Sequence, residues 1–177
     1  MQTLRYLSLI ICLFMAITIL SSCGEKSEIE IPDGFQLASD EAADYHFFIP
    51  EHWTVDAKNT STSAYVSAND PASVSIVTWT LSNTDFTLDE WWEGYLPEFE
   101  SVYSNFAVTS NENILLDGVA AKKITYTGSL GTTDYKFTQT AAIRDSIIYV
   151  LTYTSTAERF DEHTEDLDSI IEYFEFK

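Results

Sequence analysis

Cysteine, glycine and basic residues are all scarce in this chain of 177 residues, which contains two Cys, six Gly and nine Lys plus Arg. The cysteines, Cys12 and Cys23, both lie near the N-terminus, so the rest of the chain has neither a disulfide nor a thiol nucleophile. No Gly-rich phosphate loop is present, and no serine stands in a nucleophile-elbow context. We therefore expect no catalytic residue of these classes.

Positive charge is outweighed by 28 Asp plus Glu, which gives a formal net charge of −19. Nucleic-acid binding requires a basic footprint, and this chain has none. Anionic lipid headgroups would also repel so acidic a domain. We expect no nucleic acid among the partners, and a domain that stands away from any membrane to which it is attached.

Aromatic residues, in contrast, are abundant, with 11 Phe, 10 Tyr and 4 Trp. A chain of this length can bury about two-thirds of its unfolded surface, so one domain can build a core without disulfides. The aromatic content favours such a packed domain over a disordered chain, despite the charge.

The N-terminus has the pattern of an export signal, because Arg5 precedes an apolar stretch that runs from Tyr6 to Leu20. The apolar part, about 14 residues, is shorter than the roughly 20 residues that cross a bilayer as a helix. Small residues, Ser21 and Ser22, follow it. The pattern predicts a cleaved signal peptide over residues 1–22 rather than a lasting transmembrane helix.

The segment Leu20-Ser21-Ser22-Cys23 resembles the lipobox of bacterial lipoproteins. The resemblance implies that Cys23 carries a diacylglyceryl group and acyl (palmitate) chains and becomes the first mature residue, while Cys12 leaves with the signal. Two acyl chains anchor a protein stably where one holds only marginally. The alternative is a cysteine that follows a signal peptide by chance. We expect lipid anchoring on the extracytoplasmic face of a bacterial cell membrane.

Residues 23–33 form the lipidated cysteine and an acidic tether in this interpretation, and residues 34–177 form the folded domain. The tether segment, 24–33, is polar and acidic. Ten flexible residues give a reach of roughly 15–20 Å.

Two-residue alternation in the mature domain predicts a series of short antiparallel strands. Their predicted ranges are 35–38, 45–49, 63–68, 73–81, 112–116, 119–127, 135–143 and 146–154. Asp117-Gly118 predicts a tight hairpin between two of them, because Gly accepts a positive φ.

Two helices interrupt these strands. Capping-box patterns begin at Thr87 and at Ser155, and each is followed by apolar residues at helical spacing. The first predicted stripe is Leu88, Trp92, Tyr95, Phe99 and Val102, and the second is Phe160, Thr164, Leu167, Ile171 and Phe174. Pro97 removes an amide, which predicts a kink or break near Tyr95. The predicted fold class is α+β, an antiparallel sheet covered by two main helices.

The segment from Tyr45 to Trp53, YHFFIPEHW, resembles the opening of the PsbP-like family, in which an aromatic strand runs into Pro and then Trp. The order of strands and helices over residues 34–176 is similar as well. The resemblance implies an α/β/α sandwich. Photosynthetic members assist the oxygen-evolving complex and many bacterial relatives are lipoproteins, but only the fold pattern connects this chain to them.

Histidines and acids are the remaining candidates for chemistry. His46, Glu51 and His52 could form a small metal or acid–base group, although their spacing matches no established ligand motif and surface positions explain them more simply. The acids of 161–168 would lie on a solvated helical face, because no Gly-containing calcium loop accompanies them. His163 is expected at the edge of the core with a hydrogen bond. The loop 128–133 is expected to be a hairpin connection rather than a ligand loop.

These patterns favour a non-catalytic binding or assembly-assisting module of the bacterial envelope, with no metal and no cofactor, held by its lipid anchor near a protein partner. The alternatives are a carboxylate-based or metal-assisted enzyme and a divalent-cation-binding protein. Trp91 and Trp92 are the candidate partner surface, because Trp dominates many interfaces. Neighbouring positions on a helix lie about 100° apart, so Trp91 could face solvent; alternatively, both indoles pack.

Replacing Cys23 with Ala should abolish lipid attachment and leave the precursor uncleaved at this site, because the peptidase would lack its lipid-modified substrate. Fatty-acid labelling and detergent phase partitioning of both chains measure this. A Cys23→Ala chain that is cleaved after residue 22 and remains membrane-bound would show that the lipoprotein interpretation is wrong.

Overall fold

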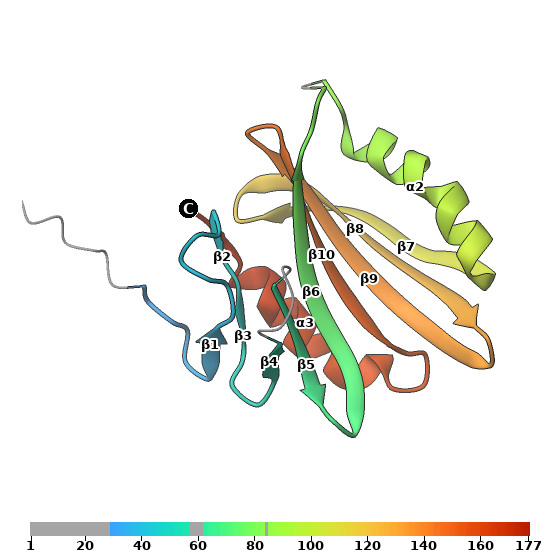
Figure 1. Cartoon of the computed structure of the whole chain (residues 1–177), viewed down its shortest axis with the longest axis horizontal. Helices are drawn as coiled ribbons and strands as arrows, with labels where there is room; N and C mark the ends of the chain where they lie inside the picture. Colours follow the sequence, from blue (N-terminus) through green and yellow to red (C-terminus); the bar gives the residue numbers. More distant parts are fainter. Residues whose placement is uncertain (1–28, 57–61, 84) are drawn as a thin grey trace, which may run out of the picture. The chain divides into compact units, whose positions relative to one another are not determined.

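The computed structural model describes residues 29–56, 62–83 and 85–177, and residues 31–177 form one compact unit (Figure 1). The predicted signal peptide, Cys23 and residues 24–28 of the predicted tether lie outside the described residues. Among the residues that are described, no helix is long and apolar enough to cross a bilayer.

One antiparallel sheet of seven strands dominates the compact unit. Its spatial order is β4-β5-β6-β10-β9-β8-β7. In sequence order the strands are β4 (Thr54–Asp56), β5 (Thr62–Ser67), β6 (Asp70–Thr80), β7 (Ser104–Leu116), β8 (Val119–Leu130), β9 (Thr133–Arg144) and β10 (Ile147–Thr156). Tight turns join most neighbours, and the predicted turn at Asp117-Gly118 is confirmed, with φ values of 44° and 75°. The antiparallel prediction is therefore confirmed.

Four short strands lie outside this sheet. β1 (Phe35–Leu37) pairs with β3 (Phe48–Pro50), and β2 (Tyr45–His46) pairs with β11 (Glu175–Phe176) at the C-terminus. The sequence patterns predicted neither β4 nor β11, because strands of two or three residues carry too little alternation to be recognised. Hydrogen bonding to a partner strand, β5 for β4 and β2 for β11, defines these short strands.

Helix α2 (Leu88–Val102) begins with the predicted capping box. The Glu90 amide donates to Thr87 Oγ1 at 3.1 Å, and the Thr87 amide donates to Glu90 Oε2 at 2.8 Å. The predicted break near Tyr95 is wrong, since α2 continues through Pro97. Pro97 and Glu93 are both exposed, so solvent can hydrate the Glu93 carbonyl that loses its amide partner.

The second predicted helix starts later than its capping-box pattern indicates. Ser155 is buried in β10, and a short 3-10 helix, η1 (Phe160–His163), leads into α3 (Thr164–Glu172). Ser155 is part of a strand and not of a helix cap, because β10 and β9 pair as far as Thr156. The predicted apolar stripe of this segment is nonetheless confirmed for Phe160, Leu167, Ile171 and Phe174, which are all buried.

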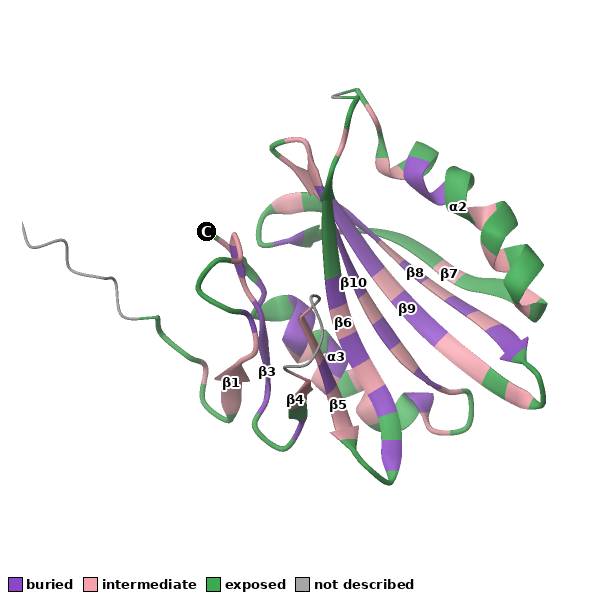
Figure 2. Cartoon of the chain, viewed as in Figure 1, coloured by how far each residue is buried: buried purple, intermediate pink, exposed green. Residues whose placement is uncertain are grey.

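The sheet contributes buried residues to two separate cores. Buried positions recur along the central strands β6, β10 and β9 (Figure 2). On β6, Val74 and Ile76 belong to the core formed with η1, α3 and β3. On β10, Val150 belongs to a second core, formed with α2. The apolar stripe of α2 is rotated from the predicted one, because Trp91 is buried whereas Tyr95 and Val102 are 38% and 52% exposed.

The predicted sandwich is therefore present in a form that is mostly sheet. α2 is the only long helix among the described residues, and α3 has nine residues. On the α3 face, strands β1 to β3 complete the covering layer with Phe47, Ile49 and other apolar side chains. The description as two main helices over a sheet holds only approximately.

Gly128 is required by a close approach to α2. A Cβ placed there would lie 2.6 Å from Cβ of Tyr103, so Gly128→Ala should lower the free energy of unfolding by about 1–3 kcal/mol. Gly94, on the exposed side of α2, has nothing within 4 Å, and Gly94→Ala should raise it by about 0.5–1 kcal/mol. Urea unfolding measures both, and equal effects of the two substitutions would contradict the packing described here.

Candidate functional site

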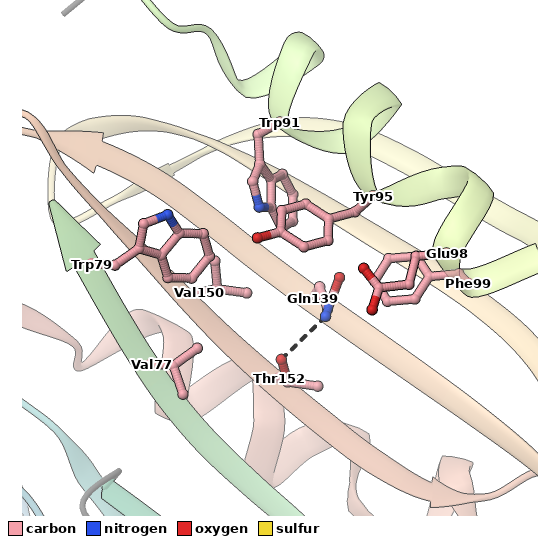
Figure 3. Close-up of a pocket in the computed structure, with 9 residues that line it drawn as sticks. All are labelled: Val77, Trp79, Trp91, Tyr95, Glu98, Phe99, Gln139, Val150 and Thr152. Atoms are coloured by element: carbon pink, nitrogen blue, oxygen red, sulfur yellow. Dashed lines mark hydrogen bonds between the residues drawn. The ribbon is translucent and has the colours of Figure 1, made fainter. Parts of the chain in front are cut away.

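A groove runs between α2 and the neighbouring part of the sheet, because α2 packs mainly on β7, β8 and β9. It encloses about 260 Å³ and is called the α2 groove below (Figure 3). Its lining comes from four elements, β6, β9, β10 and α2: Val77, Trp79, Trp91, Tyr95, Glu98, Phe99, Gln139, Val150 and Thr152. Only Glu98 among these residues carries a charge at neutral pH.

Aromatic rings form the walls of the α2 groove. The ring centroids of Trp79 and Tyr95 lie 6.3 Å apart in a T-shaped arrangement, and those of Trp91 and Tyr95 lie 6.0 Å apart. A second hollow of about 250 Å³ adjoins the groove and shares these three residues. Val77 and Trp79 on β6 are 42% and 36% exposed, so the apolar surface is open to solvent.

The two tryptophans predicted as a partner surface are both buried. Trp91 is 2% exposed and Trp92 is 7% exposed, which agrees with the alternative that both indoles pack. The exposed anchor considered for Trp91 is therefore wrong. The two indoles pack on the sheet with Tyr126 and Phe137, and Trp91 also lines the α2 groove from inside. A direct partner role for either residue stays a prediction.

Of the nine residues that line the groove, the sequence interpretation named only Trp91 as a binding candidate and missed the other eight, including the exposed wall residues Trp79 and Tyr95. One signal was available: the predicted strand 73–81 carries apolar residues on both of its alternations at its end, Ile76 on one and Val77 and Trp79 on the other. Apolar residues on both alternations, with an indole on the one that begins with Ser73 and Ser75, indicate a second covered or binding face.

His46 and His52 contact two different carboxylates, neither of them Glu51, so the predicted group of His46, Glu51 and His52 does not form. His46 Nδ1 lies 3.2 Å from Glu175 across the β2–β11 pair. His52 Nε2 lies 3.3 Å from Asp166. These contacts are those of histidines at strand ends and surfaces.

His163 occupies the predicted position at the edge of the core. Its Nε2 lies 2.8 Å from Oδ2 of the buried Asp70, and its ring meets Trp53 edge-on with centroids 5.9 Å apart. The hydrogen bond expected for His163 is confirmed. The contact joins η1 to the start of β6.

Asp70, Glu162 and His163 are the one set of three potential metal ligands that converge among the described residues. Arg159 already bridges both acids, with Nη2 at 2.7 Å from Asp70 and 2.9 Å from Glu162. A metal ion would have to compete with this guanidinium for the same oxygens. The arrangement is that of an ion-pair network between β6 and η1.

Two further acids of 161–168 pair with lysines of the sheet. Asp161 pairs with Lys136 at 3.0 Å, and Asp168 pairs with Lys123 at 2.8 Å. The loop 128–133 is confirmed as a hairpin connection, because β8 and β9 pair as far as Leu130 and Thr133.

Asp70 should make stability depend on acid pH. Burial alone would raise the pKa of this carboxyl, but hydrogen bonds from His163 and the Ala72 amide and the charge of Arg159 together lower it. A lowered pKa contributes stability that is complete above the ordinary Asp value of about 3.9 and is lost as the pH falls through the folded-state value.

Urea unfolding of the native chain and Asp70→Asn at several pH values tests this. The difference in their unfolding free energies should be constant above about pH 5 and should shrink below about pH 4. Asp168→Asn, which removes a 67% exposed carboxylate, should stay close to the native chain throughout. A difference for Asp70→Asn that persists unchanged to pH 2 would contradict the prediction.

Comparison with solved structures finds the same fold in proteins of very different sequence. Cyanobacterial PsbP (CyanoP) from Synechocystis sp. PCC 6803 matches with a TM-score of 0.61 at 17% identity, covering 89% of this chain and 99% of that one. LpqN of Mycobacterium tuberculosis, described as involved in cell envelope biogenesis, matches with a TM-score of 0.53 at 14% identity, covering 85% and 82%. The Saccharomyces cerevisiae Ran-binding protein Mog1p matches with a TM-score of 0.59 at 6% identity, covering 80% and 95%.

Identities this low show a shared fold and nothing more. No curated protein matches the sequence of this chain. The family model described as PsbP-like protein, however, matches residues 26–176, almost all of the compact unit. The aromatic opening strand, the antiparallel sheet and the helices on its two faces agree with that match, and the chain belongs to the PsbP-like protein family.

Proposed function

We propose that this chain is a lipid-anchored, non-catalytic binding module on the extracytoplasmic face of a bacterial membrane, and that the α2 groove receives its protein partner. The lipobox-like segment ending at Cys23 supports the anchor. LpqN, which shares the fold, is described as involved in cell envelope biogenesis, and this is consistent with an envelope location for this chain too.

The observation that carries the proposal is the open aromatic surface of the α2 groove. Val77, Trp79 and Tyr95 are each more than a third exposed, and together they form one apolar patch beside a hollow. Exposed apolar patches of this kind mark interaction sites, since leaving them in water costs free energy that a partner recovers.

The chemistry of the groove favours binding over catalysis. Catalysis by paired carboxylates requires two acids that face one substrate, and Glu98 is the one carboxylate in the lining. Asp70, the one buried acid among the described residues, lies on the other side of the sheet and pairs with Arg159. A divalent-cation function would have to displace that guanidinium.

Site-specific crosslinking tests the proposal with a matched pair of tyrosines. Tyr95, in the groove, and Tyr173, after α3, are both 38% exposed, and Tyr173 packs on Phe35 away from the groove. A photoreactive benzoylphenylalanine at position 95 of the membrane-anchored chain should form one defined adduct in the native envelope, and at position 173 it should not.

The groove must also be needed for the adduct. Trp79→Ala removes a wall residue that is only partly buried, so the domain should still fold, but the adduct from position 95 should disappear. Equal adducts from both positions, or an adduct that survives Trp79→Ala, would refute a partner site in the α2 groove.

A further inference from the structure

The α2 groove contains two buried polar atoms that have no hydrogen-bond partner among the described residues. One is a donor, the indole Nε1 of Trp91, and the other is an acceptor, Oε1 of Gln139. Trp91 is 2% exposed, and Figure 3 shows its indole nitrogen on the side of the ring that faces the sheet. An unpaired buried polar group costs about 1–3 kcal/mol, so a ligand that pairs both atoms gains affinity.

A peptide unit has the matching pair of groups. Its carbonyl can accept from Trp91 Nε1, and its N–H can donate to Gln139 Oε1. The side-chain amide of Gln139 is held in place by its other end, since Nε2 donates to Thr152 Oγ1 at 3.4 Å. The groove and the second hollow share Trp79, Trp91 and Tyr95, so two alternate side chains of an extended segment have a place to pack.

The charge of α2 indicates which side chains these are. The helix carries five carboxylates, at Asp89, Glu90, Glu93, Glu98 and Glu100, and no basic residue. Asp89 pairs with Lys122 and Glu90 belongs to the capping box. Glu98, at the rim of the groove, has no ion-pair partner among the described residues and is exposed.

The described part of the chain has little positive charge to offer this rim. Five of its basic side chains form ion pairs elsewhere: Lys122, Lys123, Lys136, Arg144 and Arg159. Lys177 donates to the carbonyls of Glu41 and Ala43. Aromatic faces also attract guanidinium groups, which suits a wall of Trp and Tyr.

We propose that the α2 groove binds an extended basic segment of the partner protein, with one peptide unit between Trp91 and Gln139 and an arginine or lysine between Glu98 and the rings of Trp79 and Tyr95. This inference rests on the proposed function and adds the chemistry of the partner. The same acidic surface that repels nucleic acid and lipid headgroups then steers the partner toward the groove.

Indole N–H signals in the nitrogen-15 spectrum test the proposal directly, since the chain has four Trp. The probe is an acetylated, amidated pentapeptide in which alanine and arginine alternate. It should shift the signals of Trp79 and Trp91 saturably. The signal of Trp53 should stay in place, because its indole donates to Asp166 in the opposite core. Raising the salt concentration should weaken the binding.

Matched controls separate charge from the peptide unit. The same peptide with citrulline in place of arginine keeps the shape but not the charge, and should bind several-fold more weakly. Glu98→Gln should weaken arginine-peptide binding about three- to fivefold, the range of an exposed ion pair. Glu100→Gln makes the same change of charge outside the groove lining and should have a much smaller effect. Gln139→Leu should weaken both peptides.

Three results would overturn the proposal: no shift at Trp79 and Trp91, equal binding of the arginine and citrulline peptides, or stronger shifts of the same signals by N-acetylglucosamine, which offers an amide without a charge. The crosslink from position 95 is an independent readout. If it forms and depends on Trp79 while the peptides fail, the partner site stands and the basic-segment chemistry is wrong; if it fails as well, the proposed function is wrong.

Discussion

A single helix, α2, covers one face of a seven-stranded sheet. The helix is narrower than the sheet, and the candidate site results from this difference in width. An α-helix with its side chains is about 10–12 Å wide, whereas strands lie about 4.8 Å apart, so a single helix covers two or three strands. α2 packs mainly on β7, β8 and β9. Val150 of the next strand, β10, is still buried, whereas Val77 and Trp79 of β6 beyond it stay exposed. The apolar side chains there, above all Trp79, form the wall of a groove instead of a closed core.

The opposite face of the sheet is covered by several short elements instead of one long helix. There α3, η1 and the short strands β1 to β3 together cover the sheet, and they bring aromatic residues such as Trp53 and Phe174 into the core. Asp70, Arg159 and His163 connect this layer to β6 through charged hydrogen bonds. This group of an acid, a histidine and an arginine therefore helps to hold the two layers together. That structural role accounts for the burial of Asp70.

The acidic residues, which are in large excess, differ in whether they form ion pairs. Asp161 of η1 and Asp168 of α3 pair with two lysines of the sheet, Lys136 and Lys123. Three of the five acids of α2, namely Glu93, Glu98 and Glu100, are exposed and have no ion-pair partner among the described residues, and Glu98 lines the α2 groove. The unpaired charge of Glu98 therefore makes the rim of the α2 groove acidic.

Local patterns in the sequence determined the antiparallel strands, the hairpin at Asp117-Gly118, the start of α2 and the lipobox-like segment, because each depends on side chains close together along the chain. Tertiary contacts decided the rest. Ser155 has the pattern of a helix cap but belongs to β10, since pairing with β9 outweighs a local hydroxyl bond. Trp91 is buried and Tyr95 exposed because the helix is rotated to fit the sheet beneath it. The groove itself joins residues of α2, β6, β9 and β10, and no local pattern determines how far a helix reaches across a sheet, because that depends on packing between segments distant in sequence.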